Sequence, residues 1–151
     1  MSENTVIEKK ARIHFSEEQA QLLEIAESFS RDKAPISTVR NLLDTDSGFD
    51  KDVWAEMANL GWLGIAIPEE FGGSGLSVAE VVTIVEPMGR MLLATPMIST
   101  TLAAQLLLDA GSAAQQADLL PKIAGGAIAA LAMSEEHGGG DVNHLAGSYT
   151  H

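Results

Sequence analysis

The strongest candidate for binding chemistry lies near the C-terminal end of the sequence, where a serine precedes a run of glycines. Ser134 follows a small apolar stretch, and Gly138, Gly139 and Gly140 come shortly after it. Glycines let the backbone approach a cofactor or a substrate closely, and a serine hydroxyl can donate a hydrogen bond to such a group. The alternative is an ordinary turn in which the hydroxyl bonds to its own backbone.

Acid–base and metal chemistry find little support in the spacing of the other polar residues. Acids are paired at Glu17-Glu18, Glu69-Glu70 and Glu135-Glu136, but neighbouring side chains point apart and do not form a catalytic dyad. The four histidines lack the spacing of metal ligands, so no metal is expected, and the absence of cysteine excludes thiolate chemistry. The glycine-rich run at 68–75 lacks the Lys-Ser/Thr of a phosphate-binding loop and is interpreted as a structural turn.

Composition limits the classes of partner. The 151 residues include 21 acidic and 9 basic side chains, for a formal net charge of -12. This charge argues against binding to nucleic acid and to an anionic membrane surface. No secretory signal and no apolar run of membrane-spanning length is visible, so we expect a cytoplasmic protein.

The pattern of apolar residues predicts an orthogonal, mainly α-helical domain of five or six helices. Capping boxes, in which a serine is followed three residues later by Gln or Glu, mark helix starts at Ser16, Ser77 and Ser112. Helical spacing, glycines and prolines predict helices from Ser16 to the break at Pro35, at about 37–44, from Ser47 or Asp50 to a left-handed cap at Gly61, at 77–93, at 96–110, and at 112–124 with a kink or split at Pro121. The helix at 96–110 is apolar nearly all round, which predicts that it is buried.

The sequence changes character after the glycines at 125–126. Residues 127–134 are interpreted as the first strand of a new element that has no partner strands within the chain. The fold prediction is therefore a flexible lead-in at 1–14, a helical domain at 15–124 and an incomplete β segment at 125–151. An unpaired edge of this kind recruits other chains, so we expect the isolated protein to self-associate.

Three stretches share their order and spacing with one known family. They are GWLGIAIPEEFGGSGLS at 61–77, VEPMGR at 85–90, and LLPKIAGG at 119–126 with AMSEEHGGGD at 132–141. Taken together they resemble the acyl-CoA dehydrogenase family from Phe15 to Asp141. The resemblance implies that 15–124 is the N-terminal helical domain and that 125–151 is the truncated start of the middle, flavin-binding β domain.

The resemblance also implies a chemistry. The family uses FAD to oxidise the α,β-bond of an acyl-CoA thioester to the enoyl-CoA, passes the electrons to an electron-transfer flavoprotein, and forms homo- or hetero-oligomers. The catalytic base of the family is a glutamate of the C-terminal domain, so none of the acids here is assigned that role and the chain alone is expected to be inactive. The resemblance assigns FAD contacts to Leu131, Met133, Ser134 and Gly139, and substrate contacts to Gly140, Met97 and Thr101. Thr100 and Ala104 are further candidates for shaping the acyl pocket, with ordinary core packing as the alternative.

Two positions depart from the family pattern. Gly140 stands where the family usually has Ser or Thr, and Glu136 stands where it has Pro. These departures indicate either a divergent substrate class or a subunit whose own site is degraded. The alternatives to a dehydrogenase domain are a short non-catalytic partner subunit of a longer dehydrogenase, and a related acyl-CoA oxidase or flavin monooxygenase.

Overall fold

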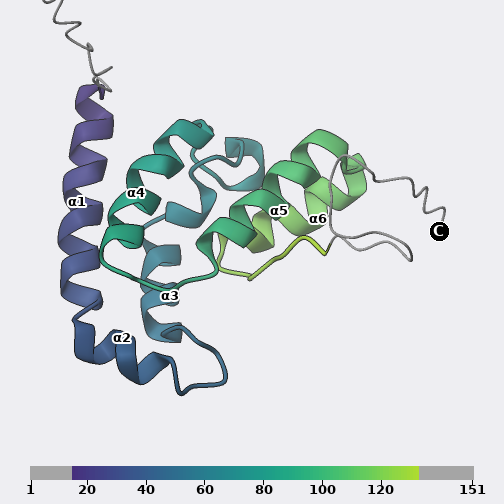
Figure 1. The fold of residues 1–151 in the computed structure, drawn as a ribbon. Helices are drawn as coiled ribbons and strands as arrows, with labels where there is room; N and C mark the ends of the chain where they lie inside the picture. The colour runs from purple at the N-terminus through teal and green to yellow at the C-terminus, as the bar shows by residue number, and fades with distance from the viewer. Residues whose placement is uncertain (1–14, 133–151) are drawn as a thin grey trace, which may run out of the picture.

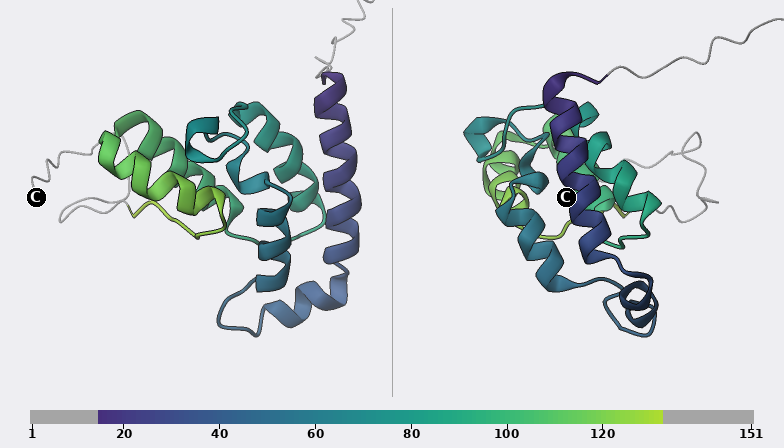
Figure 2. Two further views of the ribbon diagram at one scale, coloured as in Figure 1. Left: turned by 180° about the vertical axis from the view of Figure 1, so that it is seen from behind. Right: turned by 90° about the vertical axis from the view of Figure 1, so that its left-hand side faces the viewer.

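The computed structural model describes residues 15–132, and this part of the chain is helical. Its elements, in chain order, are α1 (Glu17–Lys33), α2 (Ile36–Leu42), α3 (Lys51–Asn59), the 3-10 turns η1 (Trp62–Gly64) and η2 (Glu69–Phe71), α4 (Val78–Arg90), α5 (Met97–Ala110) and α6 (Ala113–Ala124). The long helix α1 stands at one side against α4, and α5 and α6 form a pair at the other side (Figures 1 and 2). The predicted mainly α fold is confirmed, and no helix of residues 15–132 has the length and apolar character needed to cross a membrane.

The helix starts follow from the capping boxes. Ser16, Ser77 and Ser112 each cap a helix, and in each case the Gln or Glu three residues later accepts a hydrogen bond from the backbone N–H of the serine. Each box satisfies N–H groups that a helix start would otherwise leave unpaired. The left-handed conformation predicted for Gly61 is also present, with φ 76° and ψ 8°. All four of these local predictions are confirmed.

The first and fourth helices run in the same direction and are tied at two points. Near their N-termini, Gln19 Nε2 donates to Glu80 Oε1 at 3.0 Å, so the two capping boxes are joined. At the C-terminal end of α4, Arg90 Nη1 donates to Glu27 Oε1 in the second half of α1 at 3.2 Å. Hydrogen bonds from Ser77 and Gln19 lower the pKa of Glu80 from 4.5 to about 2. This pairing fixes α4, which carries one wall of the groove described below.

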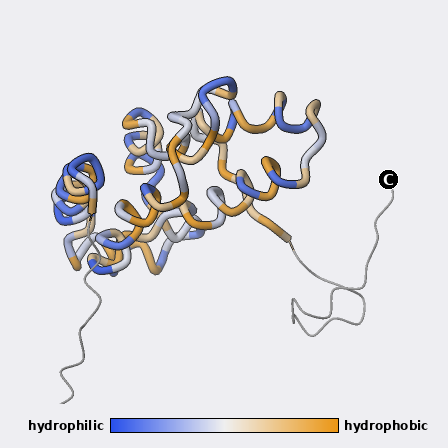
Figure 3. Tube along the Cα trace, turned by 90° about the horizontal axis from the view of Figure 1, so that it is seen from above, coloured by the Kyte–Doolittle hydropathy of each residue, from blue (hydrophilic) through white to orange (hydrophobic). Residues whose placement is uncertain are grey.

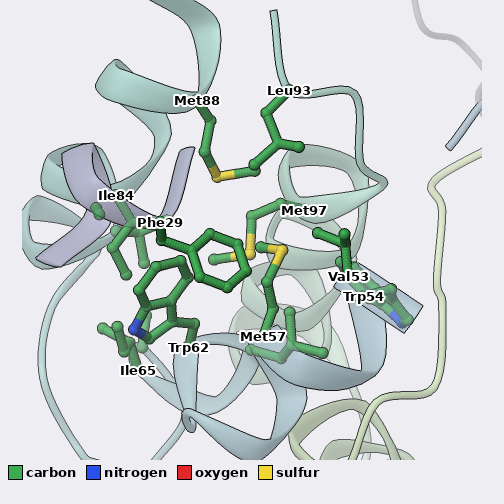
Figure 4. Packing of buried hydrophobic residues seen from close by; sticks show 14 residues of the cluster. Phe29, Val53, Trp54, Met57, Trp62, Ile65, Ile84, Met88, Leu93 and Met97 are labelled. Carbon is green, nitrogen blue, oxygen red and sulfur yellow. The ribbon is translucent and has the colours of Figure 1, made fainter. Parts of the chain in front are cut away.

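Two apolar clusters hold the helices together. The larger cluster joins α1, α3, α4 and the start of α5, and at its centre the rings of Phe29 and Trp62 meet edge to face with centroids 4.9 Å apart. Figure 4 shows Met57 and Met97 pointing toward each other beside these rings. The smaller cluster joins Ile67 to α5 and α6. Because Met97 belongs to the larger cluster, α5 is anchored at its first residue.

Some predicted boundaries are wrong. The fourth helix ends at Arg90 and not near 93, because Leu92 adopts φ 60° and the N–H of Leu93 turns back to the carbonyl of Met88 at 2.9 Å. This is the hydrogen-bond pattern of a glycine cap, here with a leucine in the left-handed position. The last helix ends at Ala124, as predicted, and of the kink or split expected at Pro121 the split is not present, because the helix continues through Pro121.

Two larger predictions also need correction. The helix α5 is not buried on all sides, since Ile98 and Leu102 are 58% and 56% exposed. The strand predicted from 127 is not formed over 127–132, the part of it that the structure describes, although the segment is apolar (Figure 3). No strand pairs with it among residues 15–132, and a single strand has no ladder of hydrogen bonds to define it.

Candidate functional site

The candidate site is an apolar groove between α4 and α5. It encloses about 330 Å3 and is lined by Val78, Val81, Val82, Val85, Glu86, Ile98, Thr101 and Leu102. The capping box at Ser77 sets the start of α4, and Pro96, which precedes the first residue of α5, sets the start of the other wall. Three of the aliphatic side chains that line it, on Val82, Ile98 and Leu102, are more than half exposed. A surface of this kind suits an apolar ligand or a packed partner.

The polar groups at the groove are few. One is the hydroxyl of half-buried Thr101, and the other is the carboxylate of Glu86 at the rim. Arg90 Nη2 donates to both carboxylate oxygens of Glu86 at 2.6 Å, and this interaction raises the pKa of Arg90. Because Glu86 is engaged in an ion pair, it is poorly placed to act as a base. The groove can bind an apolar chain but supplies no acid–base pair of its own.

A smaller hollow of about 100 Å3 adjoins the groove. Val85 and Ile98 line both spaces, and Met97 closes the smaller one. The structure therefore brings together the two described residues that were predicted to contact substrate, Met97 and Thr101, one helical turn apart on α5. Methionine is flexible and adapts to irregular spaces, so Met97 can adjust the depth of the hollow.

A larger hollow lies elsewhere in the described part of the chain. It encloses about 600 Å3 between α1 and α4 and shares Val82 and Glu86 with the groove. Its polar side chains include Gln19, Glu86 and Arg90, which are already engaged: Gln19 bonds to Glu80, and Arg90 pairs with Glu86 and Glu27. We place the site in the smaller groove, because its lining is more uniformly apolar and because it contains Thr101 and adjoins Met97.

The residues predicted to contact FAD fall mostly outside the described part of the chain. Met133, Ser134 and Gly139 lie beyond residue 132, as does the predicted substrate contact Gly140. Leu131 is described, and its side chain is 45% exposed on the segment that follows α6. A half-exposed leucine fits an apolar contact to a flat ring system, so the one described residue is compatible with a flavin.

Two side chains hold this segment through hydrogen bonds that the sequence did not predict. The indole N–H of Trp54 donates to the carbonyl of Gly126 at 2.9 Å, and the hydroxyl of Thr100 pairs with the backbone of Ala129. Trp54 also belongs to the core, since it is 6% exposed. Thr100 was a candidate for the acyl pocket, but it does not line the groove. Thr100 lies on the buried stripe of α5 with Met97 and Ala104. Because a buried hydroxyl needs a hydrogen-bond partner, its position could have indicated a contact of this kind.

Comparison with known proteins identifies relatives of the chain. Residues 16–127 match the family model described as acyl-CoA dehydrogenase, N-terminal domain. The chain is 34% identical over 122 residues to the acyl-CoA dehydrogenase IpdE2 of Mycobacterium tuberculosis, covering 80% of this chain and 38% of that protein. It is 35% identical over 133 residues to the mitochondrial isovaleryl-CoA dehydrogenase of Pongo abelii, covering 84% of this chain and 31% of that protein.

Solved structures show the same fold. A structure described as the Tcur3481-Tcur3483 steroid ACAD G363A variant superposes with a TM-score of 0.68 at 34% identity, covering 73% of this chain and 30% of that one. The ChsE4-ChsE5 complex from Mycobacterium tuberculosis has a TM-score of 0.69 at 24% identity, covering 77% of this chain and 32% of that one, and supports the fold alone. The chain thus spans less than two-fifths of the length of each of these proteins.

Proposed function

The chain belongs to the acyl-CoA dehydrogenase family through its N-terminal domain, and from this premise we propose that it forms one wall of the acyl-binding site of an FAD-dependent acyl-CoA dehydrogenase. The reaction would oxidise the α,β-bond of an acyl-CoA thioester to the enoyl-CoA. The observation that carries the proposal is the apolar groove between α4 and α5, with Thr101 on its wall and Met97 beneath it.

The residues that line the groove bind the acyl chain and exclude water from it. Each methylene that leaves water for an apolar surface stabilises the complex by about 0.8 kcal/mol, so four methylenes in the groove contribute roughly 3 kcal/mol. The side chains of Val82, Ile98 and Leu102 supply that surface.

The redox and acid–base steps require other groups. FAD, when bound, supplies the acceptor for the hydride that leaves the β-carbon. Leu131, Met133, Ser134 and Gly139 are the residues of this chain that we assign to it, and Gly140 is assigned to the substrate. Removal of the α-proton needs a positioned carboxylate. Glu86, the acid that lines the groove, is paired with Arg90, so we place the base outside this chain.

The partners follow from the same proposal. An electron-transfer flavoprotein would reoxidise the flavin, and the subunits would associate as homo- or hetero-oligomers. The names of the relatives extend from isovaleryl-CoA to a steroid substrate, so the acyl group is assigned only as a class. We propose a cytoplasmic location.

A chimera tests the proposal. The chain would replace the matching N-terminal part of the isovaleryl-CoA dehydrogenase to which it is 35% identical. A folded chimera, checked by circular dichroism and gel filtration, should bind FAD, and the visible absorbance of its oxidised flavin should bleach when an acyl-CoA is added. Ile98→Trp, which fills the groove, should abolish bleaching by long acyl-CoA while FAD stays bound. A folded, FAD-loaded chimera that no acyl-CoA bleaches would contradict the proposal.

A second candidate is a short non-catalytic partner subunit. It is favoured by the similarity to the steroid ACAD Tcur3481-Tcur3483, whose name joins two proteins. The coding sequence downstream of His151 separates the two candidates: continued family-like sequence supports the catalytic domain, and a stop codon beside a gene for a longer homologue supports the partner subunit. Oxygen consumption by the FAD-loaded chimera would indicate the related oxidase or monooxygenase chemistry.

A further inference from the structure

The segment that follows α6 is held in place by side chains from two other helices. Trp54 of α3 donates its indole N–H to the carbonyl of Gly126 at 2.9 Å. Thr100 of α5 both donates to the carbonyl of Ala129, at 3.2 Å, and accepts from the N–H of the same residue, at 3.3 Å. Figure 1 shows the segment running back from the end of α6 beside α5.

The hydroxyl of Thr100 makes the pair of hydrogen bonds that a residue of a neighbouring β-strand would make. In an antiparallel pair, one residue exchanges both an N–H and a C=O bond with the residue opposite. Here a single hydroxyl provides both bonds to Ala129, and it does so from a side chain that is only 1% exposed. A threonine inside a helix commonly bonds back to a carbonyl of its own helix, whereas this one bonds to a residue 29 positions away. Ala129 also packs against the smaller apolar cluster, so the contact is seated in the core.

The position of Thr100 on α5 links this contact to the groove. Its sequence neighbour Thr101 lines the groove, and Met97 one turn earlier lines the adjoining hollow. On the other side, Ala129 stands two residues before Leu131 and five before Ser134, which are assigned to FAD. One hydroxyl therefore connects the helix that carries the acyl-binding residues to the segment that leads to the flavin-binding residues.

We propose that Thr100 is a positioning residue that couples the acyl groove to the flavin-binding segment, an inference that rests on the proposed function. Through its two bonds to Ala129, Thr100 links any shift of α5 on acyl binding to the described part of this segment. Trp54 acts as the fixed end of the same segment, because its indole is held in the larger apolar cluster.

Hydrogen exchange of the full 151-residue chain tests the contact directly. Thr100→Val keeps the shape and removes the hydroxyl, Thr100→Ser keeps the hydroxyl, and Thr101→Val is a matched control one residue away. The amide of Ala129 should exchange about five- to tenfold faster in Thr100→Val, the factor expected for the loss of one hydrogen bond. It should exchange at the wild-type rate in Thr100→Ser and Thr101→Val. An unchanged rate in Thr100→Val would overturn the proposal.

Ligand titration tests the coupling. Octanoyl-CoA, with CoA as control, would be added to the isotopically labelled chain while NMR follows the methyl groups of Val82 and Ile98 and the amide of Ala129. We expect all three to shift in the wild type and in Thr100→Ser, and only the methyl groups to shift in Thr100→Val. Methyl shifts without a shift at Ala129 in the wild type would overturn the coupling and leave the proposed function standing. If the methyl groups do not shift, both the groove as an acyl site and the coupling are overturned. The hydrogen-exchange result would then still show whether Thr100 bonds to Ala129.

Discussion

A methyl group added at Gly73 should unfold the loop between η1 and α4. A Cβ atom built there would lie 2.5 Å from the carbonyl oxygen of Gly64 and closer still to that of Ile67. Both obstacles are backbone atoms, which cannot rotate away as the end of a side chain can. Gly73→Ala therefore requires the loop itself to move.

The cost follows from what the loop is made of. Four backbone hydrogen bonds fold residues 73–76 against 64–68: Gly73 to Pro68 at 3.2 Å, Ser74 to Gly64 at 2.9 Å, Gly75 to Ile67 at 2.9 Å and Leu76 to Ile65 at 3.0 Å. Each contributes about 1 kcal/mol net. Losing two to four of them lowers the free energy of unfolding by about 2–4 kcal/mol, a large share of the roughly 5–15 kcal/mol that holds a domain folded.

The matched control is Gly89→Ala. Gly89 lies inside α4, and a Cβ atom there meets nothing within 4 Å. The same substitution should therefore raise the free energy of unfolding by about 0.5–1 kcal/mol, because alanine loses less backbone entropy in a helix than glycine does. Urea unfolding, followed by the fluorescence of buried Trp54 and Trp62, measures both variants. If Gly73→Ala falls within 1 kcal/mol of the wild type, the reasoning from loop geometry fails.

Three further predictions concern a buried hydroxyl, a carboxylate and the exposed groove. Ser30 is fully buried and its hydroxyl has no hydrogen-bond partner among the described residues, so Ser30→Ala should raise the free energy of unfolding by about 1 kcal/mol in urea titrations, and a loss of that size would point to a bonded hydroxyl. The pKa of Glu80 is lowered from 4.5 to about 2, so its contribution to stability is complete above pH 4.5 and is lost as the pH falls toward 2. Glu80→Gln should accordingly weaken the dependence of the urea midpoint on pH in that window, and an unaltered pH profile would refute the assignment. Ile98 is 58% exposed on the wall of the apolar groove, so Ile98→Ser should reduce self-association of the isolated chain in analytical ultracentrifugation. An unchanged distribution of oligomers would show that the groove is not the surface through which the chains associate.

Much of the fold could be predicted because its signals are local. A capping box needs only a serine and an acceptor three residues later, and Ser16, Ser77 and Ser112 all behave as predicted. The left-handed turn at Gly61 likewise depends on one residue type. Such features are decided within a single turn of the chain, so no knowledge of the tertiary structure is needed.

The remainder depends on which elements meet. The composition of α5 predicted a buried helix, yet Ile98 and Leu102 are exposed because no described element covers that face. The hydrogen bond from Trp54 to Gly126 joins residues 72 positions apart, and no local sequence pattern predicts it. The site was predicted in part: Met97 and Thr101 line adjoining hollows, whereas Thr100 faces away from the groove and bonds to the segment beyond α6.

The parallel arrangement of α1 and α4 has a consequence for the order in which the domain folds. The bonds that tie the two helices join residues 61 and 63 positions apart, while α5 and α6 are joined through a two-residue connection. Closing a long loop costs more entropy than closing a short one, so contacts between sequence neighbours form first. Docking of α1 is thus a late step, and its release should be the first step of partial unfolding. That release would expose Phe29 and Trp62 to water while the helical pair at the other side of the domain remains assembled.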